Sequence, residues 1–150
     1  MTFMERFKGF FTHYEIRKLE WCIVIYTIGF GLWLVLPPAA MNTESFTQVL
    51  LIMPETSWGF AYTFIGIAHG YAMKINGRAA WTPWVRAVTL LMNSLMFQTI
   101  FWAIAASNPW GTGAYTYGFF AFVFCGAAIV SAAEQCGEEL KIIRARRQNG

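Results

Sequence analysis

Few residues of this chain have both a chemically reactive side chain and a sequence neighbourhood that would favour a reaction or ligand binding. His69 lies inside a long apolar stretch, and an ionisable residue within a membrane is a candidate for ligand binding or proton transfer. Lys74 follows only five residues later, so His69 lies near the end of that stretch, where a hydrogen-bonded structural histidine is the simpler interpretation. Haem ligation by two histidines is disfavoured, because the second histidine, His13, belongs to a different segment.

The amides Asn93 and Gln98 form a second group of candidates. Both lie in an apolar stretch, and together with Thr89 they fall on one broad face of a helix. Amides inside a bilayer need hydrogen-bond partners, so this face should point into a bundle or towards another subunit. Two interpretations follow: hydrogen bonding between helices, or the lining of a polar path along the third span.

Enzymatic chemistry lacks the residues that would support it. All eight acidic residues are Glu, whereas carboxylate-dependent hydrolases and calcium sites normally include Asp. Cys22, Cys125 and Cys136 form no CxxC pair, so we expect free thiols. No phosphate-binding, nucleophile-elbow or zinc-ligand motif is present. The sequence therefore predicts a protein that is not an enzyme and that has no catalytic, cofactor-binding or metal-binding residues.

The composition indicates the environment that must position these side chains. Of the 150 residues, 57% are hydrophobic and 13% are charged, against roughly 45–50% and about 25% in soluble domains. A water-soluble chain of this length could not bury so much apolar surface. The net charge of +3 is too small for a nucleic-acid binder. The sequence thus predicts an integral membrane protein whose first partner is the lipid bilayer.

Four stretches are long and apolar enough to cross a bilayer as helices, each of which needs about 20 residues. They cover about residues 20–37, 58–75, 85–106 and 115–133. Tryptophans at Trp21, Trp58, Trp81, Trp84 and Trp110 lie at their ends, where indole rings favour the membrane interface. We therefore expect an all-α membrane protein in which residues 1–150 form one domain, a bundle of four transmembrane helices.

The basic residues predict the orientation of this bundle. All eleven lie in segments that would share one side of the membrane, and none lies in the two other loops. By the positive-inside rule, both termini are cytoplasmic in a bacterial-type inner membrane. The residues are Arg6, Lys8, Arg17, Lys18, Lys74, Arg78, Arg86, Lys141, Arg144, Arg146 and Arg147.

A three-span alternative treats the first apolar run as a signal peptide cleaved near Ala40. The preceding region is long for a signal peptide and contains Glu5, Glu15 and Glu20, which favours the four-span interpretation.

Three segments outside the spans have patterns of their own. Aromatic residues recur at helical spacing within residues 1–19, which predicts an amphipathic helix at the inner interface or packed on a neighbouring helix. Within residues 42–53, Phe46, Val49, Leu50 and Met53 form a helical stripe that would lie on the outer leaflet or cover the mouth of the bundle. Residues 134–150 should continue the fourth helix as a cytoplasmic tail.

Small residues mark the expected contacts between helices. Gly66 and Gly70 form a GxxxG pair, and Gly118 and Gly126 offer small positions on the fourth span. These four glycines are the predicted helix-packing residues.

Two glutamates lie at the cytoplasmic ends of spans. We expect Glu20 to form an interfacial ion pair with Arg17 or Lys18, while Glu134 marks the exit of the fourth span.

Residues 58–132 contain a series of short motifs in addition to Gly66 and Gly70. These are Trp58-Gly59, Ile75-Asn76-Gly77-Arg78, Pro83-Trp84-Val85-Arg86, Trp102, Thr112-Gly113 and Tyr117-Gly118. In these features about half of the chain resembles small membrane proteins of tailed bacteriophages and prophages, a class without a settled activity. Their usual pattern has a charged residue in or just after the last span, and only Glu134 could take that place here.

The resemblance implies a setting, and three functions fit it. The first is a non-enzymatic, phage-type inner-membrane protein that acts by helix packing and oligomerisation, as a lysis or exclusion factor would. The second is a small channel or transporter with a polar path along the third span. The third is an accessory subunit of a larger membrane complex.

Overall fold

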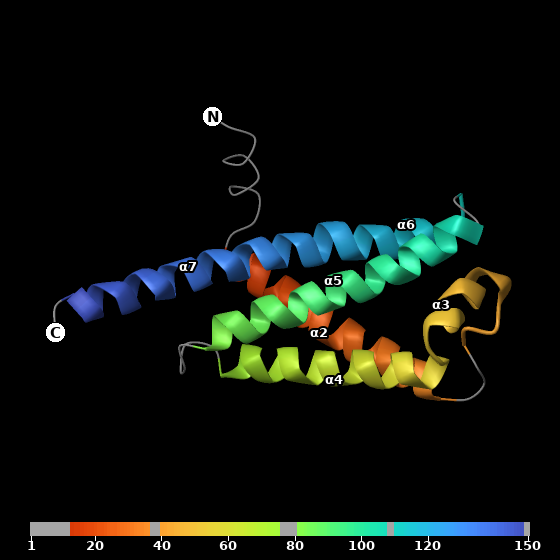
Figure 1. The fold of residues 1–150 in the computed structure, drawn as a ribbon, viewed down its shortest axis with the longest axis horizontal. Coiled ribbons are helices and arrows are strands. Elements are labelled where there is room, and N and C mark those ends of the chain that lie inside the picture. Colours follow the sequence, from red (N-terminus) through yellow and green to blue (C-terminus); the bar gives the residue numbers. More distant parts are fainter. Residues whose placement is uncertain (1–12, 37–39, 76–80, 108–109, 149–150) are drawn as a thin grey trace.

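The computed structural model describes residues 13–36, 40–75, 81–107 and 110–148, and 91% of these residues are helical. No strand occurs among them. The elements are α2 (His13–Val35), η1 (Glu44–Phe46), α3 (Thr47–Ile52), α4 (Glu55–Lys74), α5 (Thr82–Ser107), α6 (Thr112–Phe119), η2 (Phe120–Cys125) and α7 (Gly126–Gln148). Helices α6, η2 and α7 follow one another without a break and form one long rod. Figure 1 shows this rod beside α5, with α2 and α4 below and η1 and α3 at one end.

Three of the described helices are long and apolar enough to cross a membrane. They are Arg17–Val35, Thr82–Ser107 and Thr112–Ile142. This agrees with the prediction of an all-helical membrane protein. The predicted span at residues 58–75 corresponds to α4, whose 20 residues are long enough but which is not among the three. Polar residues such as Glu55, His69 and Lys74 lower its apolar character.

The first helix is longer than predicted. It begins at His13, so residues 13–19 continue directly into the first span and do not form a separate interfacial helix. Residues 1–12, which carry the rest of the predicted amphipathic segment, lie outside the described residues. At the other end of the chain, helix α7 extends to Gln148, so residues 134–148 continue the preceding helix. Figure 1 shows α7 projecting beyond the other helices.

An aromatic cluster forms the centre of the core. The rings of Phe30, Tyr62 and Phe97 lie 4.9–5.9 Å apart, and Phe120 lies 4.7 Å from Phe97. They come from α2, α4, α5 and η2, so one cluster ties the long elements together. Aromatic pairs at these separations contribute about 0.5–1.5 kcal/mol each beyond the area they bury.

Helices α2 and α4 make the most extensive contact, and glycines bring their backbones together. A Cβ atom at Gly66 would lie 2.6 Å from Ile28 Cγ1, and one at Gly70 would lie 3.0 Å from Val24 Cγ1. Two glycines outside the predicted packing set are equally close. A Cβ at Gly31 would lie 2.6 Å from the backbone nitrogen of Thr63, and one at Gly59 would lie 2.8 Å from the Gly31 carbonyl oxygen.

The two remaining glycines of the predicted packing set differ from each other. A Cβ at Gly118 would lie 2.8 Å from the Phe101 ring on α5, so the rod and α5 are in close contact there. A Cβ at Gly126 would meet no atom within 4 Å in the described part of the chain. Gly126 therefore takes part in no tight contact between the described helices.

The segment between α2 and α4 covers one end of the core. Val49 of α3 is buried in the aromatic cluster, and its carbonyl oxygen accepts a hydrogen bond from Trp58 Nε1 at 3.3 Å. The Glu55 carboxylate accepts the backbone N–H groups of Ala40 and Met41 at 2.6 and 3.1 Å. Phe46, Val49 and Met53 of the 42–53 stripe pack against the core, and Leu50 is exposed.

Candidate functional site

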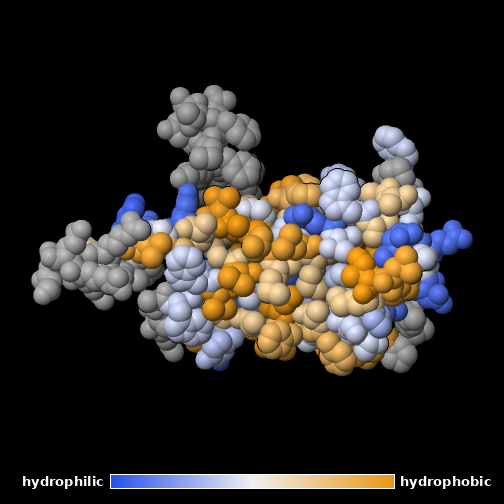
Figure 2. Space-filling view, viewed as in Figure 1, coloured by the Kyte–Doolittle hydropathy of each residue, from blue (hydrophilic) through white to orange (hydrophobic). Residues whose placement is uncertain are grey.

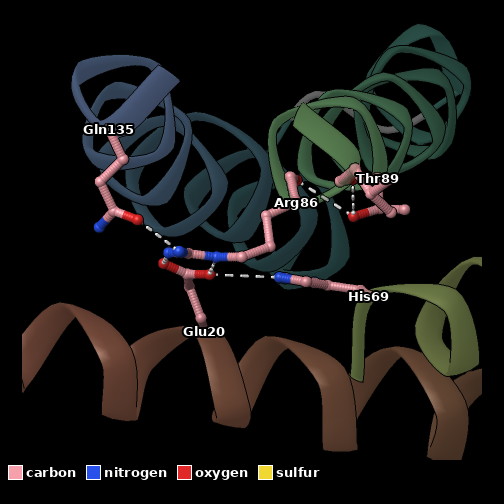
Figure 3. Close-up of polar contacts among 6 residues, drawn as sticks. Glu20, His69, Arg86, Thr89 and Gln135 are labelled. Atoms are coloured by element: carbon pink, nitrogen blue, oxygen red, sulfur yellow. Dashed lines mark hydrogen bonds and ion pairs between the residues drawn. The ribbon is translucent and has the colours of Figure 1, made fainter. Parts of the chain in front are cut away.

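A buried ionic cluster joins all four long helical elements. Arg86 of α5 donates two hydrogen bonds to the Glu20 carboxylate of α2, from Nε at 2.9 Å and from Nη2 at 2.5 Å. Its third nitrogen, Nη1, donates to Gln135 Oε1 of α7 at 2.6 Å. His69 Nε2 of α4 lies 3.3 Å from Glu20 Oε2. Figure 3 shows these side chains pointing towards one another from their separate helices.

The helical repeat explains why these residues meet. On α2, Glu20 shares its face with Ile23, Val24 and Thr27, all of which are buried. On α5, Arg86 belongs to the buried stripe Thr82, Arg86, Thr89, Leu90, Asn93 and Phe97, with the spacing of three and four residues that marks one helix face. The apolar residues of each stripe fix which face turns inward, and the charged residue on that face is carried inward with them.

Removal of this charge pair from water shapes the electrostatics of the cluster. Glu20 and Arg86 have no exposed surface, and no other side chain charged at neutral pH is fully buried among the described residues. Desolvation costs several kcal/mol per ion, and only good geometry with further hydrogen bonds offsets it. The two-pronged contact of Arg86, together with Gln135 and His69, meets this condition.

Two expectations about charges were wrong. Glu20 is fully buried and pairs with Arg86 and His69, so it does not form an interfacial ion pair. Arg86, counted with Lys74 and Arg78 among the basic residues between the second and third spans, lies in the second turn of α5 and is fully buried, because that helix begins at Thr82. A depth comparison could have found the pair. Glu20 and Arg86 lie within about two turns of the N-termini of α2 and α5, and His69 lies within two turns of the C-terminus of the antiparallel helix α4. Packing therefore places all three at one level of the bundle.

Gln98, one of the two predicted intramembrane amides, belongs to a chain of hydrogen bonds between helices. Its Nε2 donates to Ser94 Oγ at 3.0 Å, and Ser94 Oγ donates to the Ala121 carbonyl oxygen at 3.0 Å. Ala121 lies in η2, a π-helical segment in which the normal α-helical pairing of carbonyl groups is interrupted. Ser94 therefore hydrogen-bonds the rod where its helical geometry changes.

Asn93, the other amide, has a different environment. Its side chain is fully buried, and neither Oδ1 nor Nδ2 has a hydrogen-bond partner within the described chain. The same holds for the hydroxyl groups of Thr27 and Tyr62, and for Nδ1 of His69. Buried polar atoms without partners are rare in proteins, so each of them needs an explanation.

No three His, Cys, Asp or Glu residues of the described segments come together as a possible metal site. The three cysteines are free thiols. No family model, curated protein or solved structure matches this chain.

Proposed function

We propose that the chain is a four-span, non-enzymatic protein of a bacterial-type inner membrane and that it acts through helix packing and self-association. The most direct support is the distribution of side chains, which is the reverse of that in a soluble protein. Charged and polar side chains are buried, and large apolar side chains are exposed. Glu20, Arg86, His69 and Asn93 are fully buried, while Ile25, Phe64 and Leu51 are mostly exposed. In Figure 2 apolar side chains cover most of the length of the helices, and hydrophilic ones gather mainly towards the ends.

The exposed face of α4 supports its assignment as a membrane span, the second in chain order. Phe60, Phe64, Ile67 and Tyr71 are each 56–75% exposed and form one apolar stripe along this helix. The histidine that lowers its hydropathy, His69, is fully buried and lies against Glu20. A helix with an apolar outer face and its ionisable side chain inside the bundle suits a lipid environment.

Self-association would use the outer faces of the bundle. The close approach at Gly31, Gly59 and Gly66 occurs between α2 and α4, so these glycines already have partners within the chain. Gly126 lies on the rod with open space around it, and its predicted packing role requires a second copy. Small residues at such positions let the backbones of two membrane helices approach closely.

This proposal is tested by the oligomeric state in lipid bilayers, measured by single-molecule photobleaching over a range of protein-to-lipid ratios. We expect dimers or larger assemblies in the wild-type protein and a shift towards monomers in Gly126→Leu. The control is Gly29→Leu, at a glycine of α2 that likewise has no neighbour within 4 Å. Wild-type protein that stays monomeric at every ratio would refute self-association.

The resemblance to small bacteriophage membrane proteins gives this proposal its biological setting. In that setting, an assembly in the host inner membrane would serve lysis or the exclusion of other phages. Expression in bacteria tests this: growth arrest or resistance to infection should appear with the wild-type protein and weaken with Gly126→Leu.

A second candidate function, a small channel or transporter, is favoured by the unpartnered polar atoms of Asn93. The test compares ion leakage from vesicles that contain wild-type protein, Asn93→Leu or Gln98→Leu. Gln98 is the matched control because its amide already donates to Ser94. Conductance that is lost in Asn93→Leu and retained in Gln98→Leu would establish the channel, whereas we expect no wild-type leakage.

A further inference from the structure

Thr27, Tyr62 and Asn93 each lie one heptad along their helix from a member of the ionic cluster, and this spacing predicts a second polar layer. Thr27 follows Glu20 by seven residues on α2, Tyr62 precedes His69 by seven on α4, and Asn93 follows Arg86 by seven on α5. Seven residues are two helical turns, so each stays on the face of its cluster partner and is displaced by about 10 Å along the axis. Because α4 runs opposite to α2 and α5, all three displacements have the same direction (Figure 1).

This second layer lies near the middle of its helices. Thr27 is close to the centre of the candidate span Arg17–Val35, and Asn93 is close to the centre of Thr82–Ser107. Tyr62 lies within three residues of the midpoint of Glu55–Lys74. In a membrane crossed by these helices, the layer lies close to the midplane and is farthest from the water on both sides.

All three side chains are fully buried, and their four polar atoms have no partner within the described residues. The other hydroxyls show that this is not the usual state of a helical threonine. Thr63, Thr89 and Thr99 each donate to the carbonyl oxygen four residues earlier, at 2.8–2.9 Å. Thr27 makes no such bond. Each buried polar group left unsatisfied costs about 1–3 kcal/mol, so a dry layer would be a large defect in a small protein.

The chemistry of the layer selects its ligand. Two hydroxyls and one carboxamide offer donors and acceptors but no charge, so a bare ion would lack compensation. An apolar ligand would leave every polar atom unsatisfied. Water is small, donates and accepts, and is held in protein interiors by two to four polar partners.

We propose that Thr27, Tyr62 and Asn93 form an internal hydration site that binds ordered water at the centre of the bundle. The site goes beyond the proposed self-association, which uses the outer faces of the helices. A result that rules out the hydration site would leave the self-association proposal standing. A result that shows a monomeric protein would leave the hydration-site proposal standing.

The direct test is water-edited solid-state NMR on protein labelled with ¹⁵N and reconstituted in bilayers. We expect polarisation from water to reach the Asn93 side-chain amide much sooner than the backbone amide of Ala128, which is fully buried in an apolar part of the core on α7. The Asn93 signal is assigned by its loss in Asn93→Leu, and the exposed Asn42 gives the wet reference. Transfer to Asn93 as slow as transfer to Ala128 would overturn the proposal.

Two nearly isosteric variants test whether the three residues share the water. Thr27→Val and Tyr62→Phe each remove one hydroxyl, and we expect both to slow the transfer to Asn93 at least twofold. Thr99→Val is the control, because its hydroxyl donates to Leu95 and lies outside the layer. Unchanged transfer in both variants would show that the layer is not one site.

Thermal stability distinguishes a hydrated layer from a dry one, because removal of a hydroxyl changes Tm in opposite directions in the two cases. Removal of a dry, unpartnered hydroxyl raises Tm, whereas loss of a hydroxyl that binds water lowers it. We expect a lower Tm for Thr27→Val and Tyr62→Phe, and a higher Tm in both would contradict the proposal.

The NMR experiment also distinguishes water from a small polyol. Polarisation transfer to Asn93 that disappears on dialysis and returns only when glycerol is added would show a polyol site and overturn the proposal.

Discussion

The charge of Glu20 is buried where α2, α4, α5 and α7 meet. The partners of Glu20 offset the free energy that burial of this charge costs. Arg86 contacts both carboxylate oxygens, and His69 lies beside one of them. Mutation of one member leaves the other charge buried without compensation, which is far more costly than mutation of an exposed pair. The cluster should therefore behave as a unit.

For Glu20→Gln we expect a loss of about 3–5 kcal/mol in the free energy of unfolding, because the Arg86 charge stays buried. Glu44→Gln, at an exposed glutamate, should change it by less than about 0.5 kcal/mol. Unfolding in mixed micelles with increasing SDS measures both. The double variant Glu20→Leu/Arg86→Met should lose less than Glu20→Gln, and an equal or larger loss would argue against the charge pair as the cause.

The residue types in the spans could be read from the sequence, but their pairing could not. Asn93, Gln98 and His69 were predicted as intramembrane polar residues, and all three lie inside or partly inside the bundle. Glu20 was expected in an interfacial ion pair and Arg86 among the cytoplasmic basic residues, because a charge at the end of a span can reach water unless packing prevents it. Only the tertiary contacts show that packing does prevent it.

At the scale of the helices, close approach of α2 and α4 depends on glycines on both partners. A GxxxG search finds Gly66 and Gly70 on α4 and misses the Gly31–Gly59 contact. Gly31 has no glycine four positions away that would complete the motif, and its importance comes from the helix opposite. Pattern rules that consider one helix at a time cannot recover such a pair.

Gly31→Leu should destabilise the bundle by about 1–3 kcal/mol or more, because the added side chain would collide with the backbone of Thr63. Gly29→Leu, two residues earlier on the same helix, meets open space and should be close to neutral. The two unfolding free energies, measured in the same detergent, give the comparison. Equal effects would mean that α2 and α4 do not cross at Gly31.

The π-helical segment η2 is a second feature that the sequence does not reveal, since residues 120–125 read as ordinary apolar helix. Ser94→Ala removes the hydrogen bond to Ala121 and should cost about 0.6–1.7 kcal/mol, the range found for such bonds in membranes. Ser107→Ala serves as control, because that exposed hydroxyl donates only within its own helix. A smaller loss for Ser94→Ala than for Ser107→Ala would contradict a role for this contact.

For the whole molecule, the number of spans decides on which side of the membrane the C-terminus lies. Four spans place both termini on the same side, whereas three spans place them on opposite sides. Reporter fusions after Gly150 should be active only in the cytoplasmic form, and fusions at Glu44 and Gly111 only in the periplasmic form. A periplasmic C-terminus would remove α4 from the membrane and overturn the four-span proposal.

The order of synthesis gives the ionic cluster a further consequence. A ribosome delivers α2 to the membrane first, yet Arg86 is made 66 residues after Glu20, and Gln135 another 49 residues later. Until α5 emerges, His69 is the cluster member that can shelter the Glu20 carboxylate, and α2 alone carries an acidic group that lipid rejects. We therefore expect α2 to stay beside the insertion machinery until α5 arrives, so that helices enter the lipid together and not one by one.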